Sequence, residues 1–499
     1  MPLLAAGGLL AAISYISGHP APVGAQPRPG AAIETLVAEM DSTIPGRLRA
    51  YGVAGVSIAV LRRGRIVWMK AYGVADRETG RAMRVDNIFR VESISKSVTA
   101  WGVMRLIERK QVEPDMPVTA YLQDWSWPPS RFAADTITIR QLLSHRAGLP
   151  LGDFTSRYPP AGPVPDLRDT LRREARPIRP PGSGFAYSNT GFNLLELIVE
   201  TVSGMRFSDY MAREILVPLG MADASFDWSS GIGERLPVAY DLRGDPVAPY
   251  VYPGRGSGGL FATVQDIARF VQAGMAEPYR PAHRVLSPVG MNRLYTPQAR
   301  PGGLLGQAAD AYGMGVFLEQ LPEGRLGVWN GGQGAGWMAH FHSVPETGDG
   351  IVILTNSQRA WPLFALTLRD WSRWAGIGPV GMARLAWLIL AIEILIGLAI
   401  LACIVQFLRI GRGLAVGKRT FAPLAGSRPA VRLMQALLAA FLAGVLIWER
   451  SQDYLFVRSV LPHAIGWLEF AVLAAAVSFA LTAALPRRGD AHRRVPGSG

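Results

Sequence analysis

The stretch Ser93-Ile94-Ser95-Lys96 opens a segment, residues 93–107, that reads SISKSVTAWGVMRLI. Its apolar residues have the spacing of a buried helix, and on a helix Ser93 and Lys96 share one face, one turn apart. A serine hydroxyl becomes a strong nucleophile only when a base takes its proton. A lysine at a helix N-terminus can be that base, because burial and the helix dipole both disfavour its charged form. Short matches of this kind also arise by chance, so the interpretation depends on what accompanies this one.

A second group of polar residues, Tyr187-Ser188-Asn189, follows a loop rich in glycine and proline at residues 181–186. A tyrosine beside a lysine can shuttle a proton, and an asparagine amide can donate to a substrate carbonyl. Taken alone, this pattern is common in turns. The apolar run at residues 192–199 predicts that a helix follows.

A third group, Asn330-Gly331-Gly332-Gln333, precedes an alternating stretch at residues 338–344 that predicts a strand. Glycines before a strand let a substrate backbone come close, and they free N–H groups to face a developing oxyanion. A flexible surface loop is the alternative interpretation of the glycines.

These three motifs, in this order, resemble those of the serine β-lactamase and penicillin-binding-protein superfamily. The resemblance is closest to the branch of class C β-lactamases, D-alanyl-D-alanine carboxypeptidases and related esterases, and it spans roughly residues 33–358. Further segments match landmarks of that branch, namely QLLSHRAGLP (141–150), PLGM (218–221) and GGLFATVQD (258–266). The resemblance implies an α+β, β-lactamase/transpeptidase-like fold, which consists of an antiparallel sheet flanked by helices with a helical insert.

The strand patterns point to the same architecture. They lie near residues 55–67, 325–330, 337–343 and 350–356, and they therefore come from both ends of the domain. Together they predict one antiparallel sheet. Between them, residues 97–270 read as helical and loop-rich.

The resemblance also implies catalytic roles. Ser93 is expected to attack a carbonyl, while Lys96 and Tyr187 share its proton. Backbone N–H groups of Ser93 and Gln333 are expected to form the oxyanion hole. Glu92 adds a carboxylate directly before the nucleophile, and the alternative is that it is an exposed residue at the helix start, favoured there by the dipole.

The residues implied to bind substrate are Asn189, which would position the acyl amide, and Asn330, Gly331, Gly332 and Gln333 of the third motif. The family usually has a lysine or histidine where this chain has Asn330. An asparagine donates hydrogen bonds but carries no charge. The resemblance therefore supports acyl-serine chemistry while weakening any claim to β-lactams or D-alanyl peptides.

The sequence gives little support for other kinds of catalytic or binding site. A Ser-His-Asp arrangement would use His145 and Asp135, but the family uses the segment around His145 structurally. His340 and His342 alternate along a probable strand without a third ligand at metal-binding spacing, so no metal site is predicted. No nucleotide-binding fingerprint is visible, and no cofactor is predicted.

Three apolar stretches near the C-terminus, residues 385–408, 433–448 and 464–485, predict transmembrane helices. The loop after the first, residues 409–432, holds six Lys or Arg and no acidic residue. Positive loops stay in the cytoplasm. The chain is therefore predicted to be a multi-pass protein of the cell membrane whose catalytic domain is extracytoplasmic, either periplasmic or at the cell surface.

The N-terminus is consistent with export, because a short apolar segment precedes a small-residue site at residues 23–25. The predicted organisation follows the chain from end to end. It comprises a signal peptide or N-terminal anchor (1–25), a linker (26–32), the hydrolase domain (33–360), a second linker (361–384), the membrane region (385–485) and a cytoplasmic tail (486–499).

The formal net charge of +13 is explained mainly by membrane topology, because residues 381–499 hold 13 Lys or Arg against five Asp or Glu. Binding to a lipid bilayer is therefore predicted, and binding to nucleic acid is not. The single cysteine, Cys403, falls in the first predicted span, so the exported domain has no disulfide of its own. Oligomeric state cannot be inferred.

The sequence as a whole predicts a membrane-anchored serine hydrolase that acts through an acyl-enzyme. Its expected substrates are small-molecule or peptide esters and amides of the cell envelope, as for a D-alanyl peptidase or an esterase. Two alternatives stay open: a β-lactamase, and a catalytically weak sensor of an envelope ligand.

Overall fold

The computed structural model describes residues 32–281, 285–303, 305–422, 429–450, 460, 462 and 464–487. The predicted N-terminal segment 1–25 lies outside this range, as do linker residues 26–31 and tail residues 488–499. The chain divides into two units between Leu385 and Ala386. The larger unit carries the hydrolase motifs, and each unit is described by itself.

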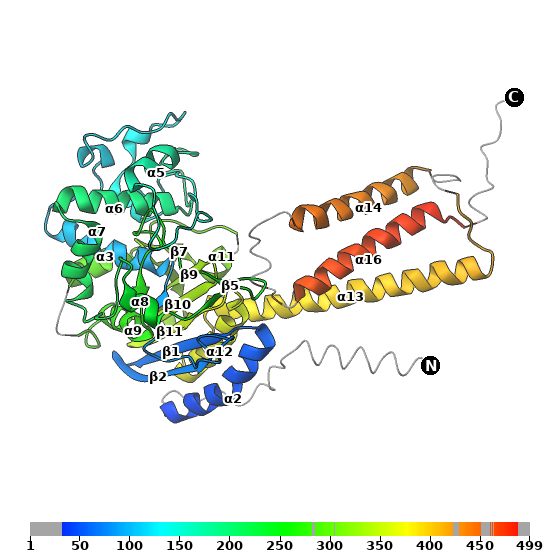
Figure 1. Ribbon diagram of the computed structural model, residues 1–499, viewed down its shortest axis with the longest axis horizontal. Coiled ribbons are helices and arrows are strands. Elements are labelled where there is room, and N and C mark those ends of the chain that lie inside the picture. The colour runs from blue at the N-terminus through cyan, green and yellow to red at the C-terminus, as the bar shows by residue number, and fades with distance from the viewer. Residues whose placement is uncertain are drawn as a thin grey trace. The chain divides into compact units, whose positions relative to one another are not determined.

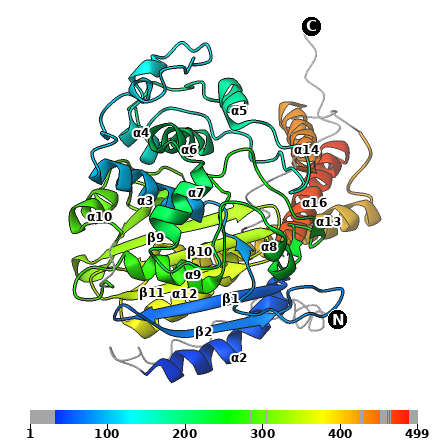
Figure 2. The ribbon, with the colours of Figure 1, turned by 60° about the vertical axis from the view of Figure 1, so that its left-hand side comes forward.

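The larger unit is built on a seven-stranded sheet with the order β2-β1-β11-β10-β9-β8-β7 (Figure 2). Every neighbouring pair is antiparallel, and β1 pairs with β11, which joins the two ends of the domain. This confirms the predicted sheet. The strands are β1 (Gly55–Arg62), β2 (Arg65–Gly73), β7 (Ala311–Tyr312), β8 (Phe317–Gln320), β9 (Leu326–Gly334), β10 (Trp337–Val344) and β11 (Asp349–Thr355).

Helices cover both faces of this sheet. Along β10, Phe341 contacts Phe270 of α9 (Val264–Ala273), whereas His342 contacts Trp371 of α12 (Trp361–Ala375). Adjacent residues of a strand point to opposite faces, so α9 and α12 lie on opposite sides. The helix α2 (Ile33–Tyr51) packs beside α12.

We expected residues 361–384 to form a linker. This prediction is wrong for the first part of the segment, which forms the helix α12. α12 is amphipathic, and it buries large side chains such as Phe364, Trp371 and Trp374. Burying a large aromatic side chain is worth roughly 2–3 kcal/mol, which is enough to keep this helix in the hydrolase domain.

A helical layer lies beside the sheet (Figure 1). Its central helix α3 (Ile94–Glu108) is buried on nearly every side and contacts both β9 and α6. The other helices of this unit are α4 (Ile139–Leu143), α5 (Leu167–Glu174), α6 (Asn189–Ser203), α7 (Phe207–Met211), α8 (Ser230–Arg235), α10 (Pro288–Tyr295) and α11 (Leu305–Ala308). Two small sheets pair β3 (Phe89–Arg90) with β6 (Phe261–Ala262) and β4 (Ala239–Tyr240) with β5 (Pro246–Val247).

The C-terminal part of the chain contains three helices that are long and apolar enough to cross a membrane. They are α13 (Gly381–Ala415), α14 (Pro429–Arg450) and α16 (Ala464–Ala484), and they include the three predicted spans almost completely. Gln406 of α13 donates to the hydroxyl of Thr482 in α16 at 3.0 Å. Such a bond satisfies two polar side chains within an otherwise apolar bundle.

Candidate active site

Ser93 and Lys96 meet at the N-terminus of α3. Ser93 is the N-cap residue, and Lys96 lies in the first turn with its side chain on the same face. The Lys96 Nζ to Ser93 Oγ distance is 3.0 Å. The structure therefore places these two groups within hydrogen-bond reach, as their spacing in the sequence predicts.

Burial prepares Lys96 to accept a proton. Its side chain is inaccessible to solvent, and this burial lowers the pKa of the amine to about 7, although the nearby Glu92 carboxylate opposes the shift. The amine also donates to the backbone carbonyl of Ser257 at 2.7 Å. A neutral amine held by that bond can direct its lone pair at the serine hydroxyl.

Tyr187 joins the same pair from the loop before α6. Burial raises the pKa of its phenol to about 12, and a hydrogen bond with the Ser93 side chain acts in the opposite direction. Lys96 Nζ lies 5.0 Å from the centre of the tyrosine ring. Because the phenol keeps its proton at neutral pH, Lys96 is the better first acceptor of the serine proton.

His145 packs against Tyr187 and holds the backbone next to it. Its Nδ1 accepts the backbone N–H of Ser188 at 3.1 Å, and its ring lies 4.3 Å from that of Tyr187. Burial, and secondarily the charge of Lys96, lower the pKa of this imidazole well below its usual value. His145 is therefore a neutral residue that holds the tyrosine loop.

Asn330 is turned away from the pocket. Its side chain is fully buried, and Nδ2 donates to the hydroxyl of Ser97 at 2.8 Å and to the carbonyl of Gly315 at 3.1 Å. Its Oδ1 accepts the N–H of Gly331 at 2.8 Å. Asn330 thus ties β9 to the first turn of α3, and its donors are already occupied.

The other residues of the third motif lie along β9. A side chain on Gly332 would collide with the carbonyl oxygen of Val91, so only glycine lets β9 approach the nucleophile segment this closely. The side chain of Gln333 accepts a hydrogen bond from Trp361 at 3.1 Å, and Gln333 also lines the pocket. Asn189 begins α6 and lines the pocket as well.

Glu92 is buried, which rules out the alternative that it is an exposed residue at the helix start. Its Oε1 accepts hydrogen bonds from Arg90 Nε at 3.0 Å and from the Tyr250 hydroxyl at 2.9 Å. The Tyr252 hydroxyl lies 3.4 Å from Oε2. Sequence reasoning missed this cluster, although Arg90 and Glu92 interrupt an apolar run at the two-residue spacing that shares one face of an extended chain.

A second buried carboxylate, Glu196 of α6, was not anticipated at all. Its Oε2 accepts the backbone N–H groups of Arg255 and Gly256 at 2.6 and 2.7 Å. Burial raises the pKa of this carboxyl to about 7. By holding this loop, Glu196 fixes the neighbouring Ser257 carbonyl, which receives the Lys96 amine.

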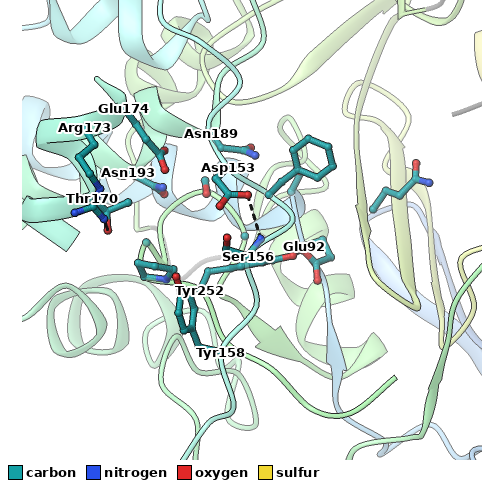
Figure 3. A pocket seen from close by; sticks show the side chains of 17 residues that line it. Glu92, Asp153, Ser156, Tyr158, Thr170, Arg173, Glu174, Asn189, Asn193 and Tyr252 are labelled. Carbon is teal, nitrogen blue, oxygen red and sulfur yellow. Dashed lines mark hydrogen bonds between the residues drawn. The ribbon is translucent and has the colours of Figure 1, made fainter. Parts of the chain in front are cut away.

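A cavity of about 180 Å³ opens beside the nucleophile, and most of its lining is polar (Figure 3). Glu92 lies at one end, whereas Thr170, Arg173 and Glu174 lie at the other. The lining residues are Glu92, Ser93, Asp153, Phe154, Ser156, Tyr158, Thr170, Arg173, Glu174, Asn189, Asn193, Tyr252, Pro253, Gly254, Ser257, Gly258 and Gln333. The arrangement can bind an acyl compound whose carbonyl meets Ser93.

No group of three or more His, Cys, Asp or Glu that could hold a metal ion occurs in the part of the chain that the structure describes. His340 and His342 are buried in β10, and desolvation lowers the pKa of both imidazoles. Their rings lie 6.1 Å apart between the sheet and α12. They therefore act as packing residues of the core.

Comparison with known proteins agrees with this geometry. A family model described as Beta-lactamase matches residues 36–370. Esterase EstB of Burkholderia gladioli is 31% identical over 284 residues, which cover 49% of this chain and 71% of that protein. The D-alanyl-D-alanine-carboxypeptidase/endopeptidase AmpH of Escherichia coli (strain K12) is 26% identical over 315 residues, which cover 61% and 80% of the two chains.

Solved structures share the fold. The octameric penicillin-binding protein homologue from Pyrococcus abyssi superposes with a TM-score of 0.56 and 25% identity, covering 64% of this chain and 73% of that one. The D-alanine carboxypeptidase AmpC from Burkholderia cenocepacia superposes with a TM-score of 0.55 over 65% of this chain and 95% of that one. At 19% identity the second likeness shows the fold alone.

Proposed function

The chain belongs to the Beta-lactamase family and is a serine hydrolase, and we propose that it acts through an acyl-enzyme on ester or peptide substrates of the cell envelope. The observation that carries this proposal is the 3.0 Å contact between Ser93 and the buried amine of Lys96. A site that had lost its catalytic function would gain nothing from a desolvated lysine beside a serine.

In the first half-reaction, Ser93 Oγ forms a bond to the substrate carbonyl carbon and Lys96 takes the serine proton. The bond to the leaving oxygen or nitrogen then breaks, and that atom receives a proton through Tyr187. In the second half-reaction, water attacks the ester carbon and its proton passes through Tyr187 to Lys96. The bond between that carbon and Ser93 Oγ then breaks, the acid is released, and Ser93 Oγ regains a proton from Lys96. N–H groups of Ser93 and Gln333 stabilise the oxyanion, each being worth roughly 3 kcal/mol of barrier.

We propose further that the three apolar helices anchor the enzyme in the cell membrane with the catalytic unit outside. The support is the distribution of charge, because residues 409–432 hold six Lys or Arg and no acidic residue. Such loops stay in the cytoplasm, so the chain before α13 would lie on the other side. The substrates within reach are then those of the envelope.

The test is the intact mass of the full chain in detergent after exposure to a fluorophosphonate and, separately, to benzylpenicillin. We expect a fluorophosphonate adduct that is lost in Ser93→Ala. A penicillin adduct as well would point to penicillin-binding-like substrates, and turnover of nitrocefin would point to the alternative, a β-lactamase. Undiminished labelling of Ser93→Ala would contradict the assignment of the nucleophile, and the absence of any adduct would favour the sensor alternative.

A further inference from the structure

We propose that Glu92 makes this site select against substrates that carry a carboxylate beside the scissile bond, so that acyl compounds with neutral or cationic leaving groups are preferred. The inference rests on the proposed acyl-enzyme function and names the substrate class of that same site. It is carried by the position of Glu92, by the charges around it and by the orientation of Asn330.

Glu92 lies directly beside the nucleophile. It directly precedes Ser93 and lines the same cavity, together with Gln333. Its carboxylate packs against the backbone of Gly334, where any side chain would collide with it. A fixed carboxylate therefore lies next to both the nucleophile and β9, the strand whose Gln333 N–H is proposed to face the oxyanion.

The charge of Glu92 faces the cavity, and its counter-ion does not. Arg90 does not line the cavity, and its guanidinium also donates to the carbonyls of Tyr250 and Gly258, both at 2.9 Å. The Oε2 of Glu92 is directed towards Tyr252, which does line the cavity. A substrate carboxylate would therefore meet Glu92 before it could reach Arg90.

In the described part of the chain, no lysine or arginine side chain lines the cavity at the end that contains Glu92. Asn330 is uncharged, and its amide is already bonded to Ser97 and Gly315. Among the described residues that line the cavity, the only lysine or arginine is Arg173, at the end opposite Glu92 (Figure 3). A carboxylate beside the scissile bond would lose its hydration without gaining a cation, which is strongly unfavourable.

The experiment uses three phenylacetyl thioesters that share the acyl group and differ in the leaving thiol: thioglycolate, mercaptoacetamide and thiocholine. Release of each thiol is followed with the full chain in detergent, and kcat/KM is compared. We expect the carboxylate-bearing thioester to be at least about tenfold poorer than the neutral amide, because like charges repel in a site of low dielectric. The cationic thioester should be equal to or better than the amide.

Two variants of the same ion pair separate charge selection from damage to the fold. Glu92→Gln removes the negative charge and should bring the ratio of amide to acid towards one. Arg90→Met removes the positive charge behind it and should increase that ratio. Both variants break the same buried pair, so a structural effect alone would move the ratio in the same direction or leave it unchanged.

Equal kcat/KM for acid and amide in the wild-type enzyme would overturn the inference, as would a shift in the same direction in both variants. If neither variant folds, the wild-type ratio decides alone, because a ratio of amide to acid of at least about tenfold supports the inference and a ratio of one contradicts it. Turnover of no thioester, together with no labelling of Ser93, would overturn the proposed function and this inference with it.

Discussion

At Lys96, one side chain combines the properties that a base and a hydrogen-bond donor require. Its burial favours the neutral amine, and the carbonyl of Ser257 holds that amine against Ser93. The spacing of Ser93 and Lys96 could be read from the sequence. The carbonyl partner could not, because it lies more than 150 positions away along the chain and is a backbone atom that any residue could supply.

The pKa of Lys96 predicts how activity depends on pH. An ammonium cannot take the serine proton, so kcat/KM for a p-nitrophenyl ester should rise with pH and level off above about 7, the pKa of the buried amine. Rates measured between pH 5 and 9 would show both the rise with pH and the level part of the profile. Lys96→Arg, which stays charged, should be slower by about 10²–10⁴-fold where the wild-type rate is level, and its rate should not rise with pH in this range. A wild-type profile that is flat from pH 5 would contradict Lys96 as the base.

At His145, we predict that asparagine can replace the imidazole. The residue has a φ of 55°, which asparagine tolerates, and the asparagine Oδ1 can accept the Ser188 N–H in place of Nδ1. His145→Asn should keep kcat/KM within about tenfold of the wild type, whereas His145→Ala should lose about 100-fold by displacing Tyr187. Loss of activity in both variants to the level of Ser93→Ala would instead make His145 a catalytic base.

At the scale of elements, the sheet could be predicted because β10 alternates, β11 is a continuous apolar run, and turns that contain glycine separate the strands. α12 could not, because a segment next to a predicted membrane span reads as a connection unless its amphipathic face is matched to a partner. The conformation of the loop at residues 254–258 could not be predicted from the sequence either. Its conformation depends on Glu196 and Thr99, which lie on two separate helices.

The close approach of β9 to the nucleophile segment gives a prediction for Gly332. A methyl group there would collide with the carbonyl of Val91, so Gly332→Ala should lower the unfolding free energy by about 1–3 kcal/mol and reduce kcat by about 100-fold. Thermal unfolding and ester turnover would measure the two effects. Gly46→Ala in α2 is the matched control, because no atom lies near its added methyl group. It should leave ester turnover unchanged and raise the unfolding free energy by about 0.5–1 kcal/mol, as alanine does in a helix interior.

At the scale of the whole molecule, the sequence predicts both a catalytic unit and apolar helices, and the structure contains both. The orientation stays a prediction, because it depends on charge counts at the ends of the spans and not on contacts. Substrate choice is the least predictable feature. The cavity collects residues from six separate parts of the chain, from Glu92 to Gln333, whose meeting only the fold determines.

The orientation can be measured with single cysteines, because Cys403 is the only native one. In a Cys403→Ser background, the exposed positions Glu78 and Lys418 are each replaced by cysteine. A membrane-impermeant maleimide should label Glu78→Cys in intact spheroplasts and Lys418→Cys only after permeabilisation. The reverse pattern would place the hydrolase domain in the cytoplasm.

The ion pair of Arg90 and Glu92 also has an evolutionary consequence. Glu92 has a φ of 49°, a conformation that glycine adopts without strain, and a glutamate codon becomes a glycine codon by one base change. That single step would leave the guanidinium of Arg90 buried without its carboxylate partner. Changing Arg90 first would leave the carboxylate of Glu92 buried without its positive partner. Each order of replacement passes through a less stable intermediate, so the pair is expected to resist loss by single substitutions even though its backbone is strained.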